Sequence, residues 1–243
     1  MKKYLPFIIL LLGIVVLIAV YFLVIKKPAE VPEEQSDIAI TVSLNERPVA
    51  SLTPSADGHW LKLKVGKLIA SAASMDYELL YGLPDGRSQG VPGTITLAGQ
   101  REIERDLLLG SESSGKFRYD EGVKEGTLTL RFRNDKGKLL TKFITKFRLA
   151  SNTIDLNSID EKFVYTLKKA SAKDFFVVME TFGIPNETDS EVVSGPYGVF
   201  SSSKLPLVGT VTLEGNLQRA TAKGWESLPD GKALDIGIFI GTN

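Results

Sequence analysis

The feature that most constrains this chain is an uncharged apolar run near the N-terminus, from Tyr4 to Ile25. As a helix these 22 residues span about 33 Å at roughly 1.5 Å per residue. That is enough to cross a hydrocarbon core of about 30 Å. Pro6 falls in the first turn, where its missing N–H costs little. The run therefore predicts a single transmembrane helix that places the chain in a lipid bilayer.

A cleaved signal peptide is the first alternative, with an apolar region of about 7–15 residues before a small-x-small cleavage site. The run here is longer, and Lys27 stands where a cleavage after Ala29 needs a small residue. We therefore predict an uncleaved signal anchor over residues 1–27. Lysines flank the run on both sides, so the positive-inside rule decides little. The short N-terminal tail favours a single-pass protein of the cell membrane whose C-terminal domains lie outside the cytoplasm.

Residues 28–37 read PAEVPEEQSD. Two prolines and four acids in ten residues cannot bury an apolar face, so this segment predicts an extended acidic tether.

The remaining sequence is patterned for β-structure. Strand-length runs occupy residues 38–44, 59–65, 77–82, 93–99, 126–133 and 139–150, with turn signals at 83–86, 111–116 and 134–138. Leu128, Leu130 and Phe132 alternate with polar residues, which is typical of a half-buried antiparallel strand. Phe143, Thr145 and Phe147 are expected to continue the inward row on the next strand. Helix signals are scarce, and the best candidate is a short stretch at residues 158–162.

This pattern predicts a mainly β fold with two β-sandwich modules, at residues 38–150 and 151–243. The stretch with Trp60 and then YELLYG (77–82) resembles strands B and C of a fibronectin type III domain. The resemblance implies Ig-like or fibronectin-III-like architecture and no function. Tyr81 and Tyr197 each precede a Gly-Thr-x-Thr-Leu-x-Gly segment at the same distance, beginning at Gly93 and Gly209. We take this as a possible tandem duplication, although such short sequence patterns are common in β-proteins.

Composition excludes several kinds of chemistry. The chain has no Cys and one His, and its 29 Lys+Arg balance 29 Asp+Glu. Disulfides, zinc-thiolate sites and thiol catalysis are thus excluded, and any Ser-His triad must use His59. No G-x-S-x-G elbow occurs. A Ser-Lys dyad has no spacing rule to test and stays open. We predict no cofactor and no metal site.

Carboxylates offer weaker candidates. Two pairs lie two residues apart and could face one side for glycoside hydrolysis, Asp76 with Glu78 and Glu102 with Glu104. The segment DLNSIDE (155–161) contains clustered oxygen ligands of the kind calcium prefers, but it lacks the glycine of an EF-hand loop. The sequence leaves open whether calcium binds near Asp155. A linker or cap accounts for the same residues.

The most distinctive local feature is a basic hairpin with ten Lys+Arg against four acids over residues 116–148. Alternation places five of them on an outward face that could bind an anionic polymer or an acidic partner. The competing interpretation is an edge protected from aggregation by its charges. No aromatic platform or recognition helix indicates nucleic acid. The candidate binding residues are Arg131, Arg133, Lys142, Lys146 and Arg148.

Two Gly- and Pro-containing loops, at residues 81–93 and 194–206, add Tyr81 and Tyr197 as candidate loop contacts. A structural role beside a glycine turn explains the duplicated tyrosines equally well.

Together these features predict a membrane-anchored, extracytoplasmic β-sandwich protein that is not an enzyme. It is expected to act as a binding, scaffold or accessory module of the cell envelope, with an envelope protein or anionic polymer as partner. A hydrolase of envelope polymer is one alternative. An outer sensor that signals through a membrane partner is another, disfavoured because only three residues precede the apolar run.

Overall fold

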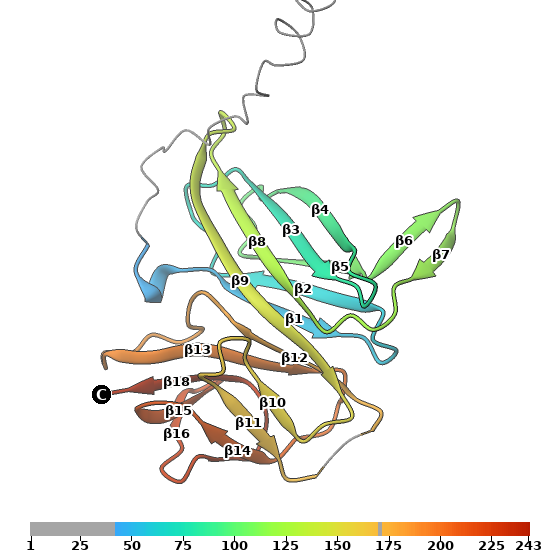
Figure 1. Ribbon diagram of the computed structural model, residues 1–243. Helices are drawn as coiled ribbons and strands as arrows, with labels where there is room; N and C mark the ends of the chain where they lie inside the picture. Colours follow the sequence, from blue (N-terminus) through green and yellow to red (C-terminus); the bar gives the residue numbers. More distant parts are fainter. Residues whose placement is uncertain (1–41, 170–171) are drawn as a thin grey trace, which may run out of the picture. The chain divides into compact units, whose positions relative to one another are not determined.

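The computed structural model describes residues 42–169 and 172–243. The predicted membrane helix at residues 4–25, its flanks and the predicted tether therefore lie outside the described residues. Within the described ranges, no helix is long and apolar enough to cross a membrane. Residues Ala39–Asn243 form one compact unit. The strands of this unit pair antiparallel, and the fold is mainly β, as predicted (Figure 1).

The only helical element in the described residues is a short 3-10 turn, η2 (Leu44–Glu46). The strands in chain order are β1 (Val49–Pro54), β2 (Trp60–Gly66), β3 (Ser74–Gly82), β4 (Ser88–Thr96), β5 (Glu102–Leu108), β6 (Gly110–Ser113), β7 (Lys116–Tyr119), β8 (Glu125–Arg133), β9 (Leu139–Ser151), β10 (Asp155–Asn157), β11 (Val164–Leu167), β12 (Phe175–Glu180), β13 (Val192–Ser201), β14 (Gly209–Thr212), β15 (Asn216–Thr221), β16 (Gly224–Ser227), β17 (Lys232–Ala233) and β18 (Ile238–Thr242).

A nine-stranded sheet organises the unit, in the order β16-β15-β18-β13-β12-β9-β8-β3-β4. Two smaller sheets accompany it, β1-β2-β5 and β10-β11-β14-β17, and β6 and β7 form a two-stranded sheet. Figure 1 shows the β6–β7 hairpin projecting away from the neighbouring strands.

The two smaller sheets cover opposite faces of the large one, and strand β12 shows why. Val177 and Met179 belong to the core formed with β1, β2 and β5, whereas Phe176 and Val178 belong to the core formed with β10, β11 and β14. Successive side chains of a strand point to opposite faces. One strand therefore serves two cores, which gives the unit a sandwich on each side of a shared sheet.

The predicted hairpins form where the turn signals lie. The Asn134 side chain accepts hydrogen bonds from the backbone N–H groups of Lys136 and Lys138, and Gly137 adopts φ 75°. The inward row is also confirmed: Leu128, Leu130, Phe132 and Phe147 are fully buried.

Two local predictions were wrong. A strand was expected at residues 38–44. Its described residues form irregular chain at 42–43 and the start of η2 at Leu44. The expected helix at 158–162 is a turn between β10 and β11. In that turn Ser158 Oγ donates to Asp160 and accepts from the N–H of Phe163, so side-chain hydrogen bonds replace helical ones.

The predicted boundary between residues 150 and 151 falls at the end of β9, which pairs with β12 inside the large sheet. The two segments of the possible duplication also differ in how their strands pair. Tyr81 and Gly93 lie on neighbouring strands, β3 and β4, whereas Tyr197 and Gly209 lie on β13 and β14, in different sheets. The pairing lends the duplication no support, and it stays a prediction from sequence.

Candidate functional site

A groove of about 560 Å³ opens where four separated segments meet, and we call it the His59 groove. Its walls come from the β1–β2 turn, the chain between β7 and β8, the end of β9, and the start of β10 with Phe175 of β12. The lining residues are Asp57, Gly58, His59, Asp120, Glu121, Gly122, Val123, Lys124, Glu125, Arg148, Leu149, Ala150, Ser151, Thr153, Asp155 and Phe175.

The β1–β2 turn is shaped by its own side chains. Asp57 Oδ1 accepts hydrogen bonds from Ser55 Oγ and from the N–H of His59. The hydrogen bond from Ser55, and to a smaller extent that from His59, holds the pKa of Asp57 below its usual value. Gly58 has φ 73°, and a Cβ added there would clash with the ring of Phe175. The turn therefore lies directly on Phe175, and glycine permits both the conformation and the close approach.

A stack of rings attaches the β6–β7 hairpin beside this turn. The His59 and Tyr119 ring centroids are 4.2 Å apart at 11°, and those of Tyr119 and Phe117 are 6.2 Å apart at 5°. Trp60 meets Phe117 edge-on. The Tyr119 ring is thus nearly parallel to both the His59 ring and the Phe117 ring. The stack places Asp120 and Glu121, which follow β7 directly, on the groove wall.

A partly buried hydrogen bond fixes Asp120. The hydroxyl of Tyr81, which is 1% exposed, donates to Asp120 Oδ2 at 2.9 Å. Burial, and then the Asp120 carboxylate, raise the pKa of Tyr81 above its ordinary range. The candidate loop residue Tyr81 therefore supports the groove from within rather than contacting a ligand at the surface.

His59 is the histidine that a Ser-His triad in this chain would have to use. Its Nε2 lies 3.9 Å from Glu121 Oε1, and its ring is stacked on Tyr119. In the described part of the chain, its imidazole makes no hydrogen bond with a serine or threonine hydroxyl, the contact that nucleophile activation requires.

The groove is acidic. Asp57, Asp120, Glu121, Glu125 and Asp155 line it, against Lys124 and Arg148. Five carboxylates and two cations leave a formal charge of −3 when His59 is neutral. Among the described residues, none of the five carboxylates forms a salt bridge with a lysine or arginine.

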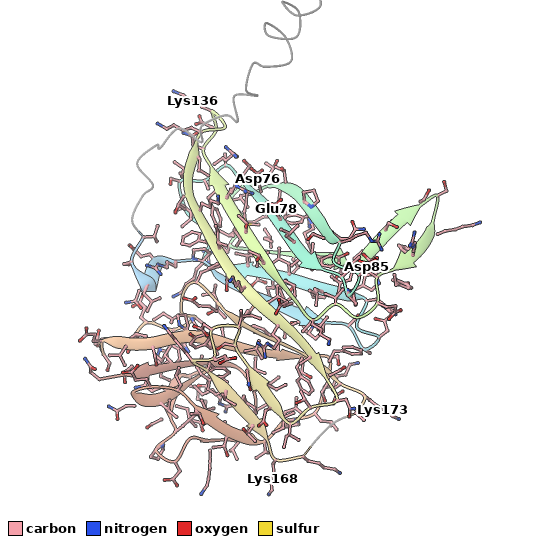
Figure 2. All side chains as sticks on the ribbon, viewed as in Figure 1. Asp76, Glu78, Asp85, Lys136, Lys168 and Lys173 are labelled. Carbon is pink, nitrogen blue, oxygen red and sulfur yellow. The ribbon has the colours of Figure 1, made fainter. Side chains whose placement is uncertain are left out.

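The predicted basic face lies elsewhere, on the outward side of β8 and β9. Arg131 Nη1 lies 3.3 Å from Glu78, and Arg133 Nε lies 2.7 Å from Asp76. Both acids are labelled in Figure 2 and belong to β3. Lys142 stands opposite Arg131 in the β8–β9 register. Neighbouring acids thus balance part of this face, and polyanion binding there stays a prediction.

The other two basic candidates, Lys146 and Arg148, line different grooves. Arg148 lines the His59 groove, while Lys146 lines a second groove. The five basic residues therefore line different grooves in part, and their role as a common binding face stays a prediction.

Tyr197 belongs to that second groove, of about 340 Å³. Its hydroxyl donates to Asp160 Oδ2 at 2.6 Å, and Ser158 Oγ donates to Asp160 Oδ1 at 2.5 Å. Burial opposes ionisation of Asp160, but these two hydrogen bonds outweigh it and lower its pKa. Glu180 is exposed as a residue, yet desolvation of its carboxyl, and then the Asp160 charge, raise its pKa. Sequence reasoning missed this pair because its members are 20 residues apart.

The carboxylates proposed from sequence have structural partners. Asp76 accepts from Arg133 and Thr94, and Glu102 and Glu104 both lie near Lys64. Asp155 accepts from Thr166 on the paired strand. Within the ranges that the structure describes, no group of three or more His, Cys, Asp or Glu side chains could hold a metal ion. Calcium binding near Asp155 thus gains no support.

Comparison of the chain with family models, with curated proteins and with solved structures found no match to any of the three. A function for this chain therefore has to be inferred from its sequence and from the geometry of its grooves.

Proposed function

We propose that this chain is a membrane-anchored, extracytoplasmic binding module of the cell envelope. In this proposal residues 4–25 cross the bilayer and residues 28–37 form the tether. The β-unit, as two Ig-like or fibronectin-III-like modules sharing a sheet, then presents the His59 groove to an envelope protein.

The observation that carries the proposal is the combination of an open groove with five carboxylates that form no salt bridge with a lysine or arginine among the described residues. A groove of about 560 Å³ lies within the usual range of ligand sites, about 300–1,000 Å³. Val123 and Leu149 are at most 8% exposed and give it an apolar base. Two of its carboxylates are held in place by hydrogen bonds, Asp57 by Ser55 and Asp120 by Tyr81. A preformed surface of this kind favours binding without costly reordering.

Photo-crosslinking in cells tests this function. A photoreactive phenylalanine analogue would replace Lys124 in the groove and, as control, Lys232 on β17, whose side chain is 80% exposed. We expect one discrete adduct from position 124 and none from position 232. Equal crosslinking at both positions, or none at either, contradicts a groove partner.

Topology is tested separately, because the chain lacks cysteine. Ser113, exposed on β6, is replaced by cysteine, and intact cells are treated with a membrane-impermeant maleimide. Labelling of intact cells is expected. Labelling only after lysis, with any outer membrane already permeabilised, would place the β-unit in the cytoplasm.

A second function, hydrolysis of an envelope polymer, is favoured by one observation. Asp160 and Glu180 line the same groove, and their environments move their pKa values in opposite directions, as in many acid–base pairs. Glu180→Gln would then abolish release of polymer fragments, whereas Glu161→Gln, on the adjoining turn, would not. Absence of any cleavage by the wild-type chain removes this candidate.

A further inference from the structure

We propose that the His59 groove binds an extended protein segment that carries several lysine or arginine side chains. This inference rests on the proposed binding function and adds the chemistry of the partner.

Charge is the first argument. Several acids elsewhere on the unit form salt bridges with a cation on the neighbouring strand, as Asp106 does with Lys62 and Glu226 with Arg219. In the groove, five carboxylates face two cations, and none of the five forms such a bridge within the described residues. Glu121 is open to solvent, with its side chain 82% exposed. Such a wall attracts positive charge and repels an anionic polymer.

The base of the groove supplies the second argument. Val123, Leu149 and the half-buried Phe175 are apolar and lie among the acids. Lysine and arginine bury their methylene stems on apolar surface while their charged heads stay near polar groups. An apolar base with acidic walls suits both parts of these side chains.

The distribution of the acids favours a segment over a single small cation. Asp57 comes from the β1–β2 turn, Glu121 and Glu125 from the chain leading into β8, and Asp155 from β10. Because the acids stand on separate walls, an extended chain can engage several of them along its length.

The experiment uses the full chain in neutral-detergent micelles and three fluorescein-labelled peptides. Each has three repeats of Gly-x-Ser, with x lysine, arginine or glutamate, and binding is followed by fluorescence anisotropy. We expect the lysine and arginine peptides to bind and the glutamate peptide not to bind. The double variant Glu121→Gln/Glu125→Gln should weaken binding about tenfold, corresponding to about 1.4 kcal/mol.

The matched control is Glu102→Gln/Glu104→Gln on β5, which changes net charge equally but outside the groove. It should leave affinity within about twofold of wild type at 0.15 M salt, where charges beyond about 8 Å are screened. Circular dichroism and the thermal transition confirm that both variants remain folded. Because all four glutamates are exposed, neither variant is expected to unfold.

Three results would overturn the inference: no binding of either basic peptide, equal weakening by both double variants, or unchanged affinity in the groove variant. A neutral oligosaccharide that binds where the peptides do not would also overturn it. If the crosslink at position 124 persists while the peptides fail, the binding function stands and only the basic partner is wrong. If the crosslink at position 124 and peptide binding are both absent, the proposed binding function and the basic partner are both wrong.

Discussion

The outward face of β3 and β8 and the His59 groove both carry acids and cations but arrange them differently. On the sheet face, Arg131 reaches Glu78 and Arg133 reaches Asp76, each across to the neighbouring strand and diagonal to its register partner. In the groove, carboxylates are held by hydroxyls and backbone N–H groups instead, as Asp120 is by Tyr81. The first arrangement balances charge across two interior strands of the large sheet, and the second leaves negative charge available to a partner.

The difference shows that a run of like charges in sequence is a poor guide to charge on the surface. The basic hairpin loses much of its excess to acids more than 50 residues earlier. The groove gains its excess from acids contributed by separate segments. Four substitutions test how far this contrast holds.

The largest effect is expected at the groove wall. Gly58→Ala introduces a Cβ into the Phe175 ring at a positive φ, so it should cost about 2–4 kcal/mol of unfolding free energy. Gly86→Ala is the matched control, since Gly86 has φ 86° but open space around its Cβ, and it should cost about 1–2 kcal/mol. Urea unfolding followed by tryptophan fluorescence measures both. Equal losses would mean that the turn is not seated on Phe175.

The next effect concerns the support of Asp120. Tyr81→Phe removes the buried hydroxyl that donates to this carboxylate and should cost about 1.5–3 kcal/mol, as for hydrogen bonds to charged groups. Tyr77→Phe, on the same strand, is the control, because no hydrogen bond of the Tyr77 hydroxyl is found in the described residues. It should change stability by less than about 0.5 kcal/mol. A similar loss in both would assign the effect to strand packing.

Removing cations should separate the two regions directly. Arg133→Gln breaks the bridge to Asp76, whose side chain is 24% exposed, and should cost about 0.5–1 kcal/mol. Lys124→Gln in the groove should cost nothing measurable. The Arg133 loss should shrink in 1 M sodium chloride, where the screening length falls to about 3 Å. A larger loss from Lys124→Gln would show that the groove carboxylates are neutralised after all.

The smallest effect is the response to acid. Burial alone would raise the pKa of Asp76, but hydrogen bonds from Arg133 and Thr94 outweigh it and lower the pKa below 3.8. A carboxyl with a lowered folded-state pKa stabilises the fold above its unfolded pKa, and this contribution disappears as pH falls through the lowered value. Between about pH 5 and pH 2, the wild type should lose more stability than Asp76→Asn. Parallel curves in pH-dependent urea unfolding would contradict this.

Local signals in the sequence predicted much of the fold. The Asn134–Lys138 turn and the alternation of Leu128, Leu130 and Phe132 involve neighbours in the chain, so their physics can be evaluated within a short window. The mainly β fold follows from these patterns. They failed at residues 158–162, where Ser158 and Asp160 form side-chain hydrogen bonds that compete with a helix.

The candidate site could be predicted only in part. Tyr81, Tyr197 and Arg148 were among the candidates and line or support the two grooves. Their partners, Asp120 and Asp160, were missed as partners because each lies 37 or more residues away from its tyrosine. No periodicity relates such positions.

By itself, the sequence determined that the described unit is built from β-strands, where several hairpins turn, and that thiol chemistry is absent. It did so because strand alternation, turn residues and composition are properties of neighbouring residues or of simple counts. Only the tertiary structure decided which charges are neutralised, that β12 serves two cores, and that His59, Glu121 and Phe175 meet at one groove. Those outcomes depend on which strands pair across long separations, and burial and Coulomb interactions act on distance in space rather than on position in the chain.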